Sequence, residues 1–139
     1  MGLLRVFSIL SIVICAVFAF NQQSVGVRGR LMCGSTALNN TQVKLWNKVN
    51  LGRDDQLAAS KTDDQGNFQI SGGTGALLPL NVHLKVYHNC DRSLPCQRKV
   101  DFTIPPQYVT RTSQVTNWYD MGMLNMQTMY KGEGVSCIN

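Results

Sequence analysis

Residues 61–70 read Lys-Thr-Asp-Asp-Gln-Gly-Asn-Phe-Gln-Ile, a polar turn that runs directly into an alternating strand. The two carboxylates of this stretch can accept hydrogen bonds from backbone N–H groups a residue or two further on, and Gly66 permits the positive φ of a tight turn. Phe68 and Ile70 then fall on one face of the strand. A calcium loop needs a distal Glu, and Gly75 stands where that Glu would be. We therefore predict a hinge between two β-strands and no calcium site.

The N-terminal segment 1–19 has the pattern of a secretory signal peptide. One cation, Arg5, precedes an apolar run over residues 6–18, which is too short to span a bilayer of ~30 Å comfortably. Val17 and Ala19 suit the positions three and one residues before a cleavage site. We expect cleavage after Ala19, with an uncleaved anchor as the alternative. The mature segment 20–139 is then secreted and extracellular, and no later stretch is apolar enough for a transmembrane span.

The mature segment is moderately basic. The whole chain has 13 Lys and Arg against 8 Asp and Glu, and loss of Arg5 leaves 12 against 8, a net charge of +4. A segment of this length buries about two-thirds of the surface that its unfolded chain exposes, which suffices for one core. We therefore expect one domain. The cations form no concentrated stripe, and this together with secretion disfavours nucleic acid as a partner.

Four cysteines remain in the mature segment, because Cys15 lies in the signal peptide: Cys33, Cys90, Cys96 and Cys137. An even number of cysteines in an oxidising compartment predicts two disulfides, and four cysteines allow three pairings. Zinc is the competing interpretation. The spacing contains no C-x-x-C pair, so we predict neither a metal site nor a cofactor.

Period-two alternation of apolar side chains predicts seven strands, over residues 25–33, 41–48, 56–62, 67–71, 80–90, 97–104 and 118–126. Turn signals separate the strands, and no segment of the mature chain has a convincing helical period. These features predict an all-β fold, a seven-stranded antiparallel β-sandwich of Greek-key type.

Three further local patterns are interpreted separately from the strands. Gly72-Gly73-Thr74-Gly75 is expected to end a strand as a flexible connector, since no phosphate-loop motif accompanies it. Asn39-Asn40-Thr41 is a glycosylation sequon, so Asn39 should be exposed in the loop 34–40. Four methionines are expected to fill the core rather than to bind a metal: Met121, Met123, Met126 and Met129.

Five blocks of the sequence occur in order with the cysteines between them: Ser24 to Cys33, Val43-Lys44-Leu45-Trp46, Lys61-Thr62-Asp63 to Phe68, Lys85-Val86-Tyr87-His88-Asn89-Cys90 and Cys96-Gln97-Arg98-Lys99-Val100. Together they resemble the nematode transthyretin-like family over essentially the whole mature chain. The resemblance implies a secreted, prealbumin-like sandwich of seven strands. It implies no single biochemical activity.

The more distant hydroxyisourate hydrolases provide the enzymatic alternative. They resemble one another in a His near the start of the first strand, an Arg and a second His that line a channel, and a C-terminal Tyr-Arg-Gly-Ser. The present chain has no His in residues 25–33 and ends Val135-Ser136-Cys137-Ile138-Asn139. The hydrolase motif is absent, so we expect no enzymatic activity of this kind. The residues that shape the hormone channel of transthyretin have no matching motif either.

The remaining titratable groups suggest no catalytic site. His83 and His88 are five residues apart on one strand, which places them on opposite faces, so they cannot jointly hold a metal or relay a proton through that strand. We interpret each as an ordinary surface or edge residue. Asp101 is at an outward position of its strand, without a carboxylate neighbour in sequence.

A transthyretin-like topology would make the strands 41–48, 80–90 and 97–104 neighbours in one sheet. Their outward side chains would then form a candidate binding face: Lys44, Trp46, Lys48, His83, Lys85, Tyr87 and Lys99. Cations interleaved with aromatic rings suit an anionic lipid headgroup or an acidic patch of an extracellular receptor. A solvated sheet face, with lysines that prevent edge pairing, is the alternative.

The same topology would gather the four cysteines at one pole of the sandwich. The resemblance favours one pairing. In it, Cys90 bonds Cys96 across a hairpin loop, and Cys33 bonds Cys137 across the termini. The other pairings stay open until the Cα separations are known.

We hypothesise that the chain is a secreted, non-enzymatic binding module. It would act as an extracellular carrier or a cell-surface adaptor for an anionic lipid, a small hydrophobic ligand or a receptor, and it could form oligomers. A prealbumin-fold hydrolase is the alternative, and a secreted inhibitor that presents its loops to another protein is a third possibility.

Overall fold

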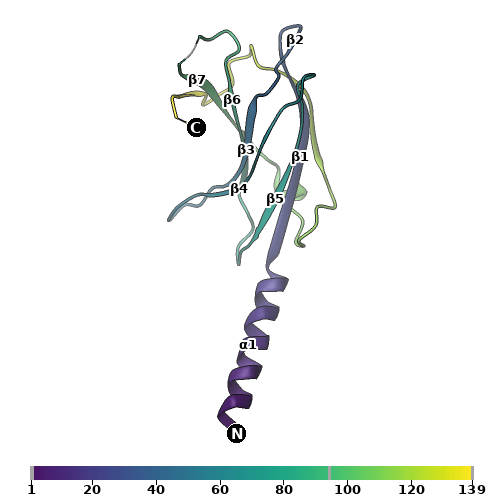
Figure 1. The fold of residues 1–139 in the computed structure, drawn as a ribbon, viewed down its shortest axis with the longest axis vertical. Helices are drawn as coiled ribbons and strands as arrows, with labels where there is room; N and C mark the ends of the chain where they lie inside the picture. Colours follow the sequence, from purple (N-terminus) through teal and green to yellow (C-terminus); the bar gives the residue numbers. More distant parts are fainter. Residues whose placement is uncertain (1, 94, 139) are drawn as a thin grey trace.

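The computed structural model describes residues 2–93 and 95–138, with the side chains of residues 14–20 excepted. A helix, α1 (Gly2–Phe20), precedes a β-sandwich (Figure 1). The strands are β1 (Gln22–Cys33), β2 (Thr36–Ala37), β3 (Gln42–Asn47), β4 (Asp55–Lys61), β5 (Asn67–Gly75), β6 (Val82–His88), β7 (Gln97–Thr103), β8 (Tyr119–Asn125) and β9 (Gly134–Ser136). A 3₁₀ turn, η1 (Pro106–Tyr108), follows β7. The seven predicted strands are confirmed as β1 and β3 to β8, and the short strands β2 and β9 were not predicted.

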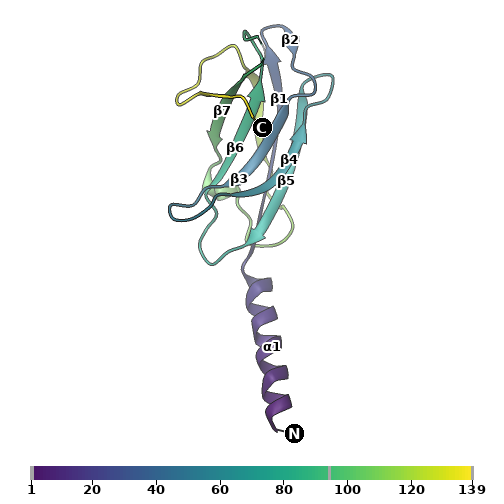
Figure 2. The same ribbon diagram turned by 60° about the vertical axis from the view of Figure 1, so that its left-hand side comes forward.

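Two sheets pack face to face (Figures 1 and 2). One sheet has the order β2-β1-β5, with β8 also paired to β1, and the other has the order β4-β3-β6-β7-β9. The pairs are antiparallel except for β1 and β8, which are parallel. The fold is therefore the predicted β-sandwich, and its first and last long strands, β1 and β8, form a parallel pair.

The core lies between the sheets and consists of the inward residues of both. Apolar side chains that are at most 4% exposed include Val25, Val27, Leu31, Phe68, Ile70, Val43, Leu45, Leu84, Val86 and Val100. Each belongs to the period-two pattern that predicted its strand. Burial of one such side chain contributes about 1.5–3 kcal/mol relative to exposure, so this alternation sets which face of each strand points outward.

The turn at residues 63–66 is confirmed in detail. The carboxylate of Asp63 accepts hydrogen bonds from the backbone N–H groups of Gln65 and Asn67, at 3.0 and 2.8 Å. Gly66 has φ of +81°, and its carbonyl accepts a hydrogen bond from the N–H of Leu31 at 2.8 Å. A Cβ at Gly66 would lie 2.3 Å from the carbonyl oxygen of Leu31, so this position requires glycine.

The interpretation of Gly72 to Gly75 as a connector is wrong, because β5 continues through these residues and pairs with β1 along its length. The glycines are needed for close packing. A Cβ at Gly72 would lie 2.6 Å from the carbonyl oxygen of Leu57, and one at Gly73 would lie 2.2 Å from that of Gln23. Backbone approaches of this kind exclude every residue with a side chain.

The expectation that the methionines fill the core holds for some of them only. Met126 is fully buried and Met121 packs against the core, but Met123 and Met129 are 64% and 74% exposed. Met123 lies on β8 next to Gly122, which has φ of +70° and interrupts the regular alternation of the strand. Met123 is thus exposed where β8 is irregular, and Met129 lies beyond the end of β8.

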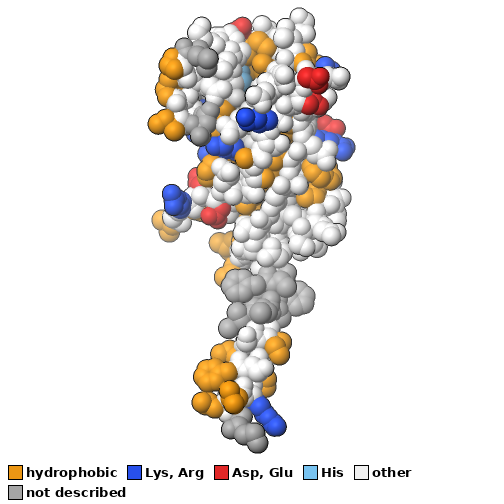
Figure 3. Space-filling view, viewed as in Figure 1, with side chains coloured by type: hydrophobic (Ala, Val, Ile, Leu, Met, Phe, Trp, Pro, Cys, Tyr) orange, Lys and Arg blue, Asp and Glu red, His pale blue; other side chains and the backbone are white. Residues whose placement is uncertain are grey.

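Helix α1 projects from the start of β1, away from both sheets (Figures 1 and 2). Hydrophobic side chains lie along its described part (Figure 3), and Leu3, Leu4 and Ile12 are each at least 66% exposed. Among the described residues, no helix combines the length and the hydropathy that a membrane crossing requires. Cleavage after Ala19 stays a prediction.

The favoured disulfide pairing is wrong. The bonds are Cys33–Cys90, with Cα atoms 5.6 Å apart, and Cys96–Cys137, with Cα atoms 4.2 Å apart. The first joins the end of β1 to the segment after β6 and so connects the two sheets. The second joins the residue before β7 to the residue after β9.

The reason for the error is strand β9. It pairs antiparallel with β7, with Gln97 opposite Ser136, and this pairing places Cys137 beside Cys96. A three-residue strand has too little periodicity to be predicted from sequence. The described cluster with metal-ligand spacing, Cys33, Cys90 and Asp91, contains the sulfurs of the first disulfide and is no thiolate site.

Candidate binding face

The strands β3, β6 and β7 place the predicted face residues on the outer side of one sheet. Lys44 is opposite Lys85, Trp46 is opposite His83, and Tyr87 is opposite Lys99. Lys48 follows the end of β3. We call the outward set Lys44, Trp46, Lys48, His83, Lys85, Tyr87 and Lys99 the basic face. The expectation that one sheet brings these residues together is confirmed.

Two lysines of the basic face lie over two aromatic rings. The Nζ of Lys85 is 4.6 Å from the ring centroid of Trp46, and the Nζ of Lys44 is 5.2 Å from that of Tyr87. Each cation–π contact at such a site contributes about 0.5–1 kcal/mol. Tyr87 is only 5% exposed, so its ring lies beneath Lys44 and does not protrude from the face.

The ammonium groups of the face influence one another. Burial lowers the pKa of Lys85 below its ordinary value, and the positive charges of Lys99 and Lys48 lower it further. Burial raises the pKa of the Tyr87 phenol, and the charge of Asp101 adds to this effect. Both directions indicate a patch that is partly shielded from water, and the effect of Lys99 and Lys48 on Lys85 shows that the ammonium groups repel one another.

Asp101 on β7 is the carboxylate that sequence reasoning did not connect to the face. Its Oδ2 accepts a hydrogen bond from the Nζ of Lys48 at 2.5 Å, and its Oδ1 lies 2.7 Å from the Nδ1 of His83. Burial alone would raise the pKa of Asp101, but the hydrogen bonds and charges of Lys48 and His83 hold it below its ordinary value. The period-two pattern of its strand placed Asp101 on the same outward side as Lys99, and this could have indicated that it belongs to the face.

A second polar cluster, formed by Arg98 and Glu133, lies inside the molecule and was not predicted from the sequence. Arg98 is 6% exposed, and its guanidinium forms a bidentate ion pair with Glu133. It also donates hydrogen bonds to the carbonyl oxygens of Cys90, Met126 and Thr128 at 2.9, 2.7 and 3.0 Å. This cluster fastens the segment between β8 and β9 to the strand β7.

His88 borders the same cluster. It is 1% exposed, and its Nδ1 accepts a hydrogen bond from the N–H of Cys90 at 3.1 Å. Burial and the charge of Arg98 lower the pKa of His88 to about 4, against an opposing effect of Glu133. The two histidines do lie on opposite faces, but the expectation that His88 is a surface or edge residue is wrong. His88 is two residues after the inward Val86 on the same strand, and this spacing could have predicted its burial.

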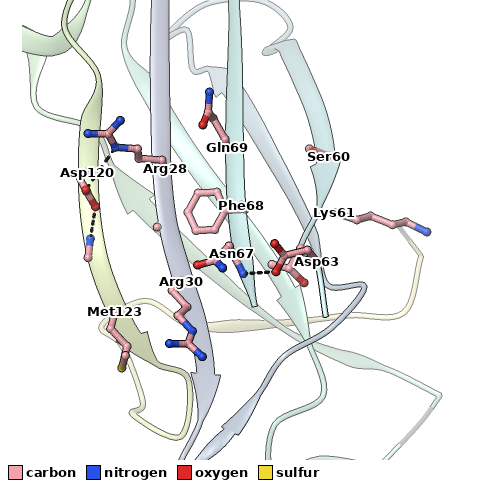
Figure 4. Close-up of a pocket in the computed structure, with 13 residues that line it drawn as sticks. Arg28, Arg30, Ser60, Lys61, Asp63, Asn67, Phe68, Gln69, Asp120 and Met123 are labelled. Atoms are coloured by element: carbon pink, nitrogen blue, oxygen red, sulfur yellow. Dashed lines mark hydrogen bonds and ion pairs between the residues drawn. The ribbon is translucent and has the colours of Figure 1, made fainter. Parts of the chain in front are cut away.

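An open cleft of about 680 Å³ is lined mainly by β1, β5 and β8 of the other sheet, together with the end of β4 (Figure 4). Arg28 forms an ion pair there with Asp120 at 3.3 Å, and both side chains are about half exposed. The carboxylate of Asp63 is occupied by the backbone of its own turn, and that of Asp120 also accepts the N–H of Gly122 at 2.8 Å. The cleft is open, and its acidic groups are already bound to neighbours.

The sequon residue Asn39 is exposed and directly precedes Asn40, which has φ of +53°. The hydroxyl of Thr41 is oriented back towards the carbonyl oxygen of Asn39, at 3.4 Å. An exposed position is what glycosylation requires, and modification at Asn39 stays a prediction.

Comparison with known proteins shows the family to which the chain belongs. The model of the transthyretin-like family, described as TTR-52, matches residues 28–105, which include β3, β6 and β7. The chain belongs to the transthyretin-like family.

Several Caenorhabditis elegans members of this family are similar over most of their length. Transthyretin-like protein 33 is 37% identical over 131 residues, which cover 91% of this chain and 92% of the relative. Transthyretin-like protein 5 is 36% identical, with coverage of 86% and 87%, and transthyretin-like protein 46 is 36% identical, with coverage of 93% and 74%. The names of these relatives state no enzymatic activity.

Proposed function

We propose that this transthyretin-like protein is a secreted, non-enzymatic binding module that holds an anionic extracellular partner on its basic face. The observation that carries the proposal is the arrangement of Lys44 and Lys85 over Tyr87 and Trp46 at the centre of a sheet. Ordered cations above aromatic rings lose less conformational entropy on binding than free surface lysines do.

Secretion is supported by two features of the chain. The segment 1–19 has the charge and hydropathy pattern of a signal peptide, and α1 stands apart from the sandwich. Two disulfides, Cys33–Cys90 and Cys96–Cys137, are typical of an oxidising compartment.

A non-enzymatic role is supported by the way the titratable groups are used. Asp101 is bound by Lys48 and His83, and Arg98 is bound by Glu133 inside the protein. A general acid or base must reach a substrate, whereas the histidine His88 is almost fully buried. The hydrolase alternative also lacks its sequence motif, as described above.

Among the partner classes predicted from the sequence, the charge of the face favours an anionic lipid or an acidic receptor surface. A small hydrophobic ligand needs a cavity that encloses it and is lined mainly by apolar groups. The cleft described above is open, and the charged groups Arg28, Asp63 and Asp120 are among its lining residues. An adaptor role is therefore better supported than that of a carrier for a hydrophobic molecule.

The test is binding of the mature, oxidised protein, residues 20–139, to the surface of intact C. elegans cells. We expect binding that weakens with salt and that is lost when Lys44, Lys85 and Lys99 are all changed to Glu. The control has Arg28, Arg111 and Lys131 changed to Glu, which gives the same net charge outside β3, β6 and β7. Equal loss in both variants, or in neither, would contradict the proposal.

A further inference from the structure

We infer that the basic face binds a sulfated polysaccharide, a polymer that carries repeated sulfate esters. This inference rests on the proposed function and names the ligand class of the same face. Four observations carry it: the charge that the face leaves uncompensated, the register of its lysines, the placement of two of them over aromatic rings and the absence of protruding apolar groups on these strands.

The positive charge of the face is compensated only in part, by the single carboxylate Asp101, which lies opposite Lys85 on β7. Asp101 binds Lys48 and His83 through its two oxygens. Among the described residues, no acidic group lies within ion-pair distance of Lys44, Lys85 or Lys99. The charges of Lys99 and Lys48 also oppose protonation of Lys85, so a bound anion would relieve a repulsion that exists in the free protein.

The uncompensated lysines lie in two adjacent rows across the strands. One row crosses Lys61 on β4, Gln42, Tyr87 and Lys99 on β7. The other contains Lys44 opposite Lys85 and then Asp101 on β7, whose two oxygens bind Lys48 and His83. Adjacent strands are ~4.8 Å apart, so the first row extends about 14 Å over three steps. This is longer than one sulfate or phosphate group. Cations at the two ends of one row, with Lys44 and Lys85 in the next, fit repeated anionic groups on a chain better than one isolated headgroup.

Two of these lysines, Lys44 and Lys85, already lie over aromatic rings before any ligand binds. The ring of Tyr87 supports Lys44, and the ring of Trp46 supports Lys85. Lysine acts as a point charge with three donors, which matches a tetrahedral oxyanion of high charge density better than a single carboxylate. Sulfate esters present three free oxygens each and keep their charge at extracellular pH.

The distribution of exposed apolar side chains argues against a bilayer as the ligand of this face. Among the described residues outside α1, the exposed large hydrophobic ones are Val49, Leu51, Leu77, Leu78, Met123, Met129, Val135 and Ile138. None of them belongs to β3, β6 or β7. Without insertion of apolar groups, four lysines near an anionic bilayer supply only about millimolar binding. A polymer adds multivalency without insertion.

The experiment is calorimetric titration of the mature, oxidised protein with a heparin-derived octasaccharide. We expect binding that falls linearly with the logarithm of salt concentration. The triple variant Lys44→Gln, Lys85→Gln, Lys99→Gln should lose at least tenfold in affinity, with the salt slope shallower by about two to three. The charge-matched control Arg28→Gln, Arg111→Gln, Lys131→Gln should bind like the wild type. Thermal unfolding of each variant establishes that it is folded before its affinity is compared.

Two further arms separate sulfate from other anions. A chemically desulfated octasaccharide, which keeps its carboxylates, should bind at least tenfold more weakly. Vesicles of phosphatidylcholine with phosphatidylserine should compete poorly. Equal affinity of the triple variant and the control, or preference for the vesicles over the octasaccharide, would overturn the inference. In the second case the face-dependent binding to cells described above would persist, so the proposed function would survive.

Discussion

Lys85 lies over the indole ring of Trp46, with its Nζ 4.6 Å from the ring centroid, although the two residues belong to different strands, β6 and β3. The contact is diagonal, because Trp46 is directly opposite His83 and Lys85 is directly opposite Lys44. A long side chain reaches such a diagonal neighbour on one sheet face. The ring therefore determines where one of the central charges of the basic face is held.

The first prediction concerns this ring. Trp46→Ala removes the support of Lys85 and should weaken octasaccharide binding about two- to fivefold, the equivalent of one exposed cation–π contact. Trp46→Phe keeps a ring and should bind nearly as the wild type does. The indole Nε1 is buried without an acceptor among the described residues, so its removal in Trp46→Phe should not lower stability through a lost hydrogen bond. Equal affinities of the two variants would show that the ring does not position the cation.

The second prediction concerns Arg98. Arg98→Met leaves the carboxylate of Glu133 buried and unpaired and should lower the free energy of unfolding by about 3–5 kcal/mol. The double variant Arg98→Met, Glu133→Leu should recover part of this loss, because no buried charge remains. Chemical denaturation of the wild type, both single variants and the double variant gives the coupling energy. Additive effects would contradict a paired cluster.

The third prediction is a pH dependence of stability that arises from His88. Its pKa is lowered from 6.5 to about 4 in the folded protein, so the unfolded chain binds the proton more tightly between these values. Stability should be fully present above pH 6.5 and should fall as the pH is lowered towards 4, by about 3 kcal/mol in total. His88→Asn keeps an acceptor for the N–H of Cys90 and should show a smaller fall over this range in denaturation experiments. The same fall in both proteins would assign the effect to other groups.

The fourth prediction returns to the turn at residues 63–66. Gly66→Ala should lower the melting temperature strongly, because a Cβ there would be 2.3 Å from the carbonyl oxygen of Leu31 at a φ of +81°. Gly122→Ala is the matched control, with φ of +70° and no atom within 4 Å of the new Cβ. It should cost only the ~1–2 kcal/mol of a left-handed residue. Octasaccharide binding by folded Gly66→Ala should be unchanged, and a loss of binding without a loss of stability would mean that the turn is part of the site.

The sequence was sufficient to predict the fold because its strands alternate regularly. Val43, Leu45, Leu84 and Val86 are all inward, as their spacing indicates, and the same parity placed Lys44 and Lys85 on the outer face. A period of two determines a face without any knowledge of the partner strand. The family resemblance supplied the remaining step, that the three strands are neighbours in one sheet, and the two together predicted the composition of the basic face.

What escaped prediction depends on contacts between distant segments. The compensation of Lys48 and His83 by Asp101 requires the pairing of β6 with β7, and the disulfide Cys96–Cys137 requires the short strand β9. No local pattern encodes either one. Arg98 was hidden for a different reason, since a charged residue at an inward position can be placed only when its partner Glu133, 35 residues further on, is known.

The most direct test of the basic face is lysine footprinting of the mature protein while it is bound to cells. Acetylation followed by mass spectrometry measures the reactivity of each lysine in the free and in the bound state. We expect Lys44, Lys85 and Lys99 to be protected on binding, while Lys131, outside the face, reacts as it does in the free protein. Unchanged reactivity of Lys44, Lys85 and Lys99 in the bound protein would show that the partner is held elsewhere and would contradict the proposed function.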